Sequence, residues 1–134
     1  MTATTPFLGQ EDVGAPSFVE HLLKAAVTSR EQAAVQALVE EERILTNDAV
    51  RRNLVRQTDD GGIQFCWQFL AYNLHSVGLD ESGRAFVNFI LSMAWCGQTS
   101  LVHVRELDER RLAILLRAMI QLSGNDNLAI TVHC

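Results

Sequence analysis

The sequence has 134 residues, of which 48% are hydrophobic and 20% are charged, and these proportions exclude a chain that is disordered throughout. A chain of this length fits a single domain that buries a core without disulfides or structural metal. The formal net charge of −5 argues against a surface devoted to nucleic acid or to anionic lipid.

The cysteines indicate a reducing compartment. Cys66, Cys96 and Cys134 are odd in number and widely spaced, and the segment Met1–Ser17 has neither the basic start nor the apolar run of a secretory signal. The longest nearly apolar stretch, Ala85–Cys96, is too short to cross a bilayer. We therefore expect free thiols and a cytoplasmic protein that does not enter a membrane.

The chain divides into a short arm and a helical domain. Residues 1–16 carry Thr, Gly, Pro and acidic residues around one apolar pair, which predicts an arm that is flexible or held by a partner. Residues 17–134 are expected to form one α+β domain. Its first helix begins with a capping box in which Ser17 precedes Glu20 by three residues.

Two further helices are expected before the middle of the chain. Ser29–Gln32 repeats the capping pattern for the second helix. Asn47 or Asp48 then caps a short third helix that presents Arg52 and Arg56 outward. The segment from 58 to 62, Thr-Asp-Asp-Gly-Gly, is a clear break after it.

The segment Ile63–Val77 has two readings. Its first residues alternate as in a strand, but a helical phase places one polar stripe on an otherwise apolar rod along the whole segment, so we predict a helix. Gly78 should end this fourth helix. A fifth helix is expected over about Ser82–Cys96, again with a single polar line, and Gly97 should close it.

The last third of the chain has a different character. Leu101–Leu107 and Leu128–Val132 have strand propensity, and between them lies a strongly amphipathic helix capped by Asp108. Strand, helix and strand in succession predict parallel pairing through a right-handed crossover. The predicted fold class is therefore α+β, mainly α, with about six helices and a small two-stranded sheet at the C-terminus.

No constellation of residues indicates a metal site or a catalytic centre. Cys96, His103, His133 and Cys134 are soft ligands that two neighbouring strands would bring together, but their spacing lacks the close pairs typical of zinc sites. Cys66 lies in an apolar helical stretch, where a thiol is normally inert. The acidic pairs precede turns or helix starts, where they act as caps. We expect no metal, no cofactor and no catalytic residue.

One pattern favours nucleic acid. The second and third expected helices have the lengths and spacing of a helix-turn-helix. The third would present Arg51, Arg52 and Arg56 to DNA, and Asp59–Gly62 would lead into a wing. The acidic run at 40–42, the acidic pair within the wing and the net negative charge oppose this interpretation.

The least ordinary feature is apolar surface on the fourth and fifth expected helices. A helix that is apolar nearly all round is either central to its own domain or covered by another chain. Two such helices in succession are difficult to bury in the centre of one small domain. Helical phase continues the polar line of the fifth helix to Trp95, which should face outward as an interface anchor. Phe89 and Trp67 are further candidates for the interface, with Trp67 on the flank of its helix.

We therefore expect a small accessory or regulatory protein that acts by binding another protein, as an inhibitor, an adaptor or a complex subunit, and that forms a homodimer. The alternative is a helix-turn-helix transcriptional regulator. A small enzyme of unknown chemistry comes third.

Overall fold

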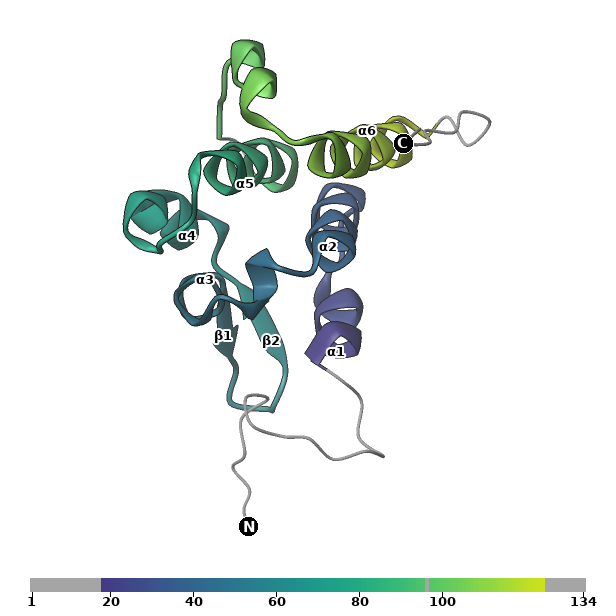
Figure 1. The fold of residues 1–134 in the computed structure, drawn as a ribbon. Coiled ribbons are helices and arrows are strands. Elements are labelled where there is room, and N and C mark those ends of the chain that lie inside the picture. Colours follow the sequence, from purple (N-terminus) through teal and green to yellow (C-terminus); the bar gives the residue numbers. More distant parts are fainter. Residues whose placement is uncertain (1–17, 96, 125–134) are drawn as a thin grey trace.

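The computed structural model describes residues 18–95 and 97–124. Six α-helices and one short antiparallel hairpin are present in these ranges, together with three short 3-10 segments (Figure 1). Along the chain they are α1 (Phe18–Ala25), α2 (Ser29–Glu41), η1 (Ile44–Thr46), α3 (Asp48–Leu54), β1 (Val55–Gln57), β2 (Ile63–Phe65), α4 (Trp67–Asn73), η2 (Leu74–Ser76), α5 (Glu81–Ala94), η3 (Leu101–Glu106) and α6 (Glu109–Ser123). The prediction of a mainly helical α+β fold with a two-stranded sheet is confirmed.

The sheet of the described residues lies in the middle of the chain, whereas the sequence predicts it at the C-terminus. Strands β1 and β2 pair in antiparallel register, with Arg56 opposite Gln64. The break predicted at 58–62 is the turn between them, in which the Thr58 amide donates to the Gly62 carbonyl at 3.0 Å. Gly61 adopts a φ of 87°, a left-handed conformation that glycine takes without steric cost. The predicted break is thus confirmed, but the sequence does not predict the strands on either side of it.

The strand predicted over Leu101–Leu107 is wrong, because this segment forms the 3-10 helix η3. The Ser100 hydroxyl accepts a hydrogen bond from the Val102 amide, and the His103 amide donates to the Ser100 carbonyl at 3.1 Å. Strand propensity reflects packing on a pleated, half-buried surface. Among the described residues the only sheet is the hairpin, so this segment has no strand beside it. Its expected partner, residues 128–132, lies outside the described ranges.

The helix predicted over Ile63–Val77 begins four residues late. Its first three residues form β2, because the turn pairs them with β1, so the strand-like alternation is the correct signal for these residues. The Cys66 amide donates to the Leu54 carbonyl at 2.6 Å, which completes the hairpin before α4 starts. Gly78 ends the helical segment as predicted, with a φ of 83°.

Helix caps fix several element boundaries. The Asn47 side chain accepts from the Val50 amide at 3.0 Å, and the Asp108 side chain accepts from the Arg111 amide at 2.7 Å, so both predicted caps are confirmed. The cap of α2 is Thr28, one residue earlier than the expected Ser29. Each such cap stabilises a helix by about 1 kcal/mol.

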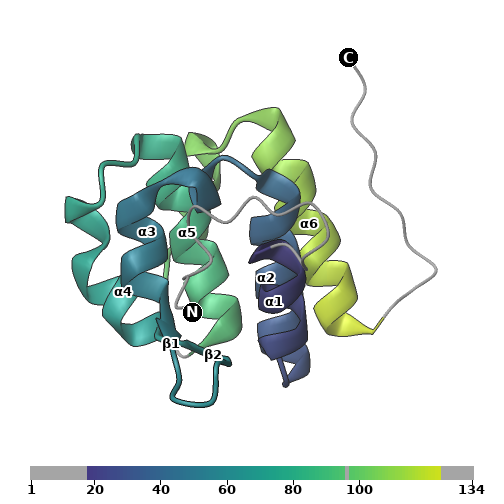
Figure 2. The ribbon, with the colours of Figure 1, turned by 90° about the horizontal axis from the view of Figure 1, so that it is seen from below.

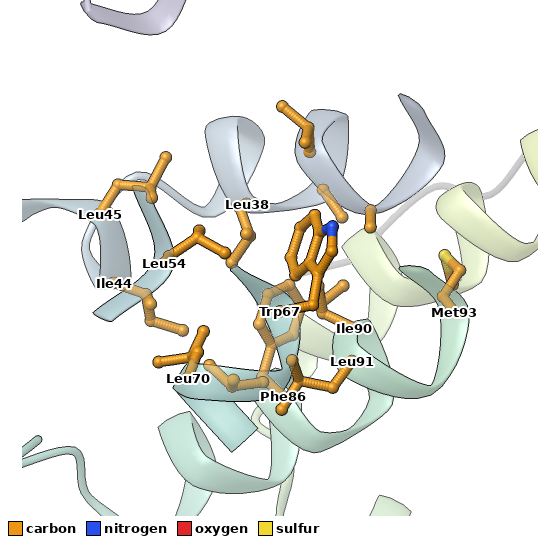
Figure 3. Packing of buried hydrophobic residues seen from close by; sticks show 14 of the residues in the cluster. Leu38, Ile44, Leu45, Leu54, Trp67, Leu70, Phe86, Ile90, Leu91 and Met93 are labelled. Atoms are coloured by element: carbon orange, nitrogen blue, oxygen red, sulfur yellow. The ribbon is translucent and has the colours of Figure 1, made fainter. Parts of the chain in front are cut away.

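The core forms around α2 and α5. Helix α2 packs against α1, α5 and α6, and Figure 1 shows it between α1 and α6. Figure 2 gives the same arrangement from below. The contribution of α5 is large, because Phe86, Val87 and Ile90 are fully buried. Figure 3 shows Phe86 and Ile90 in this core. By contrast, α4 buries only Trp67 and Leu70. The core therefore includes most of the apolar side chains of α5 but leaves Phe69 and Tyr72 of α4 exposed.

A buried ion pair connects the end of α2 to the start of α6. Glu41 is completely buried, and its carboxylate accepts from Arg111 Nε at 2.9 Å and from the Ile44 amide at 2.7 Å. Arg110 donates to the Glu41 carbonyl at 2.7 Å. These bonds satisfy both the carboxylate and the backbone carbonyl of Glu41, so they fix the position of α6 relative to the end of α2.

Candidate protein-binding groove

A groove of about 720 Å³ lies where the hairpin, α4 and the end of α5 meet. We call it the aromatic groove, because five of its nine described lining residues are aromatic. These nine are Arg56, Gln64, Phe65, Cys66, Trp67, Gln68, Phe69, Tyr72 and Trp95. Its polar lining residues, which we call the polar margin, are Arg56, Gln64 and Gln68, so both the hairpin and α4 contribute to it.

Trp67 forms a fixed wall of the groove. Its side chain is 6% exposed, and its indole N–H donates to Glu31 Oε2 at 3.0 Å. Its ring stacks on Phe65 with centroids 5.3 Å apart. Figure 3 shows the indole among core residues such as Leu38 and Ile90. Trp67 is thus a core residue that lines the groove, and only a small part of it is available to a partner.

Two other aromatic side chains form the exposed rim. Phe69 is 48% exposed and Tyr72 is 80% exposed. They are three residues apart on α4, so they lie on one face of the helix. The sequence pattern did not single them out as exposed. The available signal was their position beside the polar line through Gln68 and His75, which helical phase places on the outer surface.

Trp95 follows α5 and lines the groove. It is half-buried and packs against the core, so the expected outward orientation is only partly correct. The reason is that Trp95 is the C-cap of α5, where the chain leaves the helical phase from which that orientation was predicted. Arg30 donates to its carbonyl and to the Met93 carbonyl, which fixes the end of the helix. Phe89 packs against the core and does not line the groove.

The polar margin of the groove carries an uncompensated positive charge. Arg56 is the only charged residue among the described lining residues, and its guanidinium has no hydrogen bond or ion pair with any described side chain. Most other arginines are engaged: Arg30 with backbone carbonyls, Arg111 with Glu41, and Arg117 with Glu40. The groove is thus locally positive in a chain of net negative charge.

The three arginines of the DNA-binding alternative do not share one helix. Arg51 pairs with Asp48, and its guanidinium lies over the Phe18 ring at 5.8 Å from the centroid. Arg52 is exposed on α3. The expectation that Arg56 lies on the same helix is wrong, because α3 ends at Leu54 and Arg56 belongs to β1. The hairpin does follow α3 as a wing would.

The hairpin turn itself is acidic and internally bonded. Asp59 and Asp60 are both exposed. The Thr58 hydroxyl donates to the Asp60 carboxylate, and the Gly62 amide donates to it at 3.2 Å. These two hydrogen bonds, the hydroxyl first, lower the pKa of Asp60 below its ordinary value. A negatively charged turn is poorly suited to contact phosphate.

Other titratable clusters offer no comparable site in the described ranges. A polar hollow of about 450 Å³ between α5 and η3 contains His103, whose Nδ1 lies 3.1 Å from Glu106 Oε1. No three His, Cys, Asp or Glu residues of the described part are grouped to hold a metal ion. The other candidate ligands, Cys96, His133 and Cys134, fall outside the described residues. Cys66 is a free thiol, half-buried in the aromatic groove.

Comparison of the chain with protein-family models, curated proteins and solved structures finds no match. Within the described residues, every helix is too short or too polar to cross a bilayer.

Proposed function

We propose that this chain acts by binding another protein through the aromatic groove, as an accessory or regulatory subunit. The observation that carries the proposal is the exposed pair Phe69 and Tyr72 beside the fixed wall of Trp67. Aromatic side chains are enriched at the centres of protein interfaces, where a few of them supply most of the binding energy.

The arrangement of α4 supports a protein as the ligand. A small molecule is usually enclosed by its site, whereas Tyr72 is mostly exposed and its ring stands at the rim. Clustered large apolar side chains on a surface indicate contact with another macromolecule. Trp67 is held by both stacking and a hydrogen bond, so the wall is already ordered before a partner arrives, which lowers the entropic cost of association.

The structure offers less support for DNA binding. Arg51 is engaged by Asp48 and Phe18, and Arg56 lines the groove, so Arg52 alone remains on the surface of α3. A single arginine supplies little of the phosphate neutralisation on which DNA affinity depends.

The experiment compares partner recovery by matched variants. The tagged chain is expressed in its native host, cross-linked and purified, and the recovered proteins are quantified for wild type, Phe69→Ala, Tyr72→Ala and Leu101→Ala. Leu101 is 75% exposed on η3 and does not line the groove, so its variant is the control. We expect a partner that wild type and the control retain and both α4 variants lose. Equal recovery by all four proteins would overturn the proposal.

A further inference from the structure

We infer that the aromatic groove binds a segment of a different protein in which a carboxylate lies beside a bulky apolar side chain. This inference rests on the proposed function and specifies the chemistry of the partner. It follows from the two kinds of side chain that line the groove, one polar and one aromatic.

The polar margin is a set of hydrogen-bond donors without an acid. Arg56 and Gln64 are directly opposite in the hairpin, so their side chains lie on the same face of the sheet. Gln68, at the start of α4, lines the groove with them. The side chains of these three residues have no hydrogen-bond partner among the described residues, and a planar guanidinium matches a carboxylate with two parallel hydrogen bonds.

The nearest acids along the hairpin do not compensate this charge. Asp59 and Asp60 lie in the turn and do not line the groove, and Asp60 accepts from Thr58 and from the Gly62 amide of the same turn. The positive charge of Arg56 is therefore available to a ligand.

The aromatic margin determines the second part of the partner. This margin consists of Phe69, Tyr72 and Trp95, which line the same groove as the donors. A bulky aliphatic or aromatic side chain covers such a surface with favourable burial, and a carboxylate next to it along the same segment reaches the donors. The net charge of −5 opposes an acidic partner at long range, but physiological salt screens charges beyond about 8 Å, so the contact with Arg56 dominates at close approach.

A second copy of this chain fits the groove less well than an acidic segment. A two-fold contact places the same patch of both copies in one interface. Two Arg56 guanidinium groups would then be partly desolvated in an interface whose described lining residues include no carboxylate. Burying like charges without compensation is costly, so the groove disfavours the homodimer expected from the sequence.

The test selects a library of random peptides, displayed on phage, against the full chain. Peptides selected by wild type should be enriched in Asp or Glu next to Phe, Leu or Trp. For a selected peptide, replacing the acidic residue with its amide should weaken binding about fivefold, in keeping with one partly exposed ion pair. The Arg56→Gln variant should remove this difference, whereas Arg52→Gln, which alters an exposed arginine outside the groove, should preserve it.

The other outcomes distinguish the two proposals. Selected peptides that shift the NMR signals of Tyr72 and Gln68 but show no acidic preference overturn this inference and leave the groove as a binding site. A dimer by light scattering that Tyr72→Ala dissociates identifies a second copy as the occupant and also overturns it. If no selected peptide shifts a signal of the groove and the chain is monomeric, both the inference and the proposed function fail.

Discussion

The indole of Trp67 and the carboxylate of Glu31 join α4 to α2 through a hydrogen bond of 3.0 Å. The other Glu31 oxygen accepts from the Val27 amide, so this one side chain also ties the segment between α1 and α2. Since Trp67 is a wall of the aromatic groove, the orientation of that wall depends on a residue of the central helix.

Replacement of Glu31 should therefore destabilise the fold and remove the hydrogen bond that orients Trp67. We expect Glu31→Ala to lower the free energy of unfolding by about 1 to 3 kcal/mol, because the buried indole N–H loses its partner. Urea denaturation followed by circular dichroism measures the loss. The matched control, Gln36→Ala on the exposed face of α2, should change stability by about 0.5 kcal/mol at most. Equal effects of the two substitutions would contradict the assigned role.

The different positions of α4 and α5 in the fold predict opposite responses to truncation of an aromatic side chain. Phe86 is fully buried, so Phe86→Ala should cost about 3 to 5 kcal/mol. Tyr72 is 80% exposed, so Tyr72→Ala should leave the melting temperature nearly unchanged. Thermal unfolding of both variants tests this contrast. A large loss of stability in Tyr72→Ala would mean that its ring is part of the core.

The pair formed by Glu41 and Arg111 predicts strong non-additivity. Arg111→Met leaves the buried Glu41 carboxylate without its main partner and should cost about 3 to 5 kcal/mol. The double variant Glu41→Leu with Arg111→Met should recover much of this loss, because neither buried charge remains. Additive losses in a double-mutant cycle would show that the two side chains are not coupled.

The hairpin turn predicts a specific dependence on pH. The Thr58 hydroxyl is the first cause of the lowered pKa of Asp60, so Thr58→Val should raise that pKa toward its ordinary value. Because the folded pKa lies below the unfolded one, the stabilisation of the turn is present above the unfolded pKa and is lost as the pH falls through the folded pKa. NMR titration of the Asp60 carboxyl carbon in both proteins checks the pKa, and urea denaturation at several pH values checks the stability. An unchanged Asp60 midpoint in the variant would contradict them.

The caps and turns of this chain could be predicted from short stretches of sequence, whereas the location of its strands could not. Asn47, Asp108 and Gly78 act where the sequence placed them, because capping depends on a few neighbouring residues. The segment 63–65 is predicted as helix because the helical phase covers the whole of Ile63–Val77, whereas the alternation that indicates its strand is short. Its strand state depends on pairing with β1, a contact that helical periodicity does not express.

The candidate site was predicted in part. The excess of apolar surface on the fourth and fifth expected helices led to Trp67 and Trp95, and both line the groove. The sequence does not show which of the two helices, α4 or α5, is buried in the core, because that depends on the packing of α2 against α5. For the same reason the exposed Phe69 and Tyr72 were missed, and Phe89 was included although it packs against the core.

The central claim is that the rim of the aromatic groove contacts another protein. The most direct measurement replaces Tyr72 with the photo-cross-linker p-benzoylphenylalanine in the native host, with the same replacement at the exposed Leu101 as the control. We expect irradiation to attach one partner protein at position 72 and not at position 101. The Arg56→Gln substitution in the same chain should weaken that product. Identical products from both positions, or no product at position 72 in cells that express the protein, would contradict the claim.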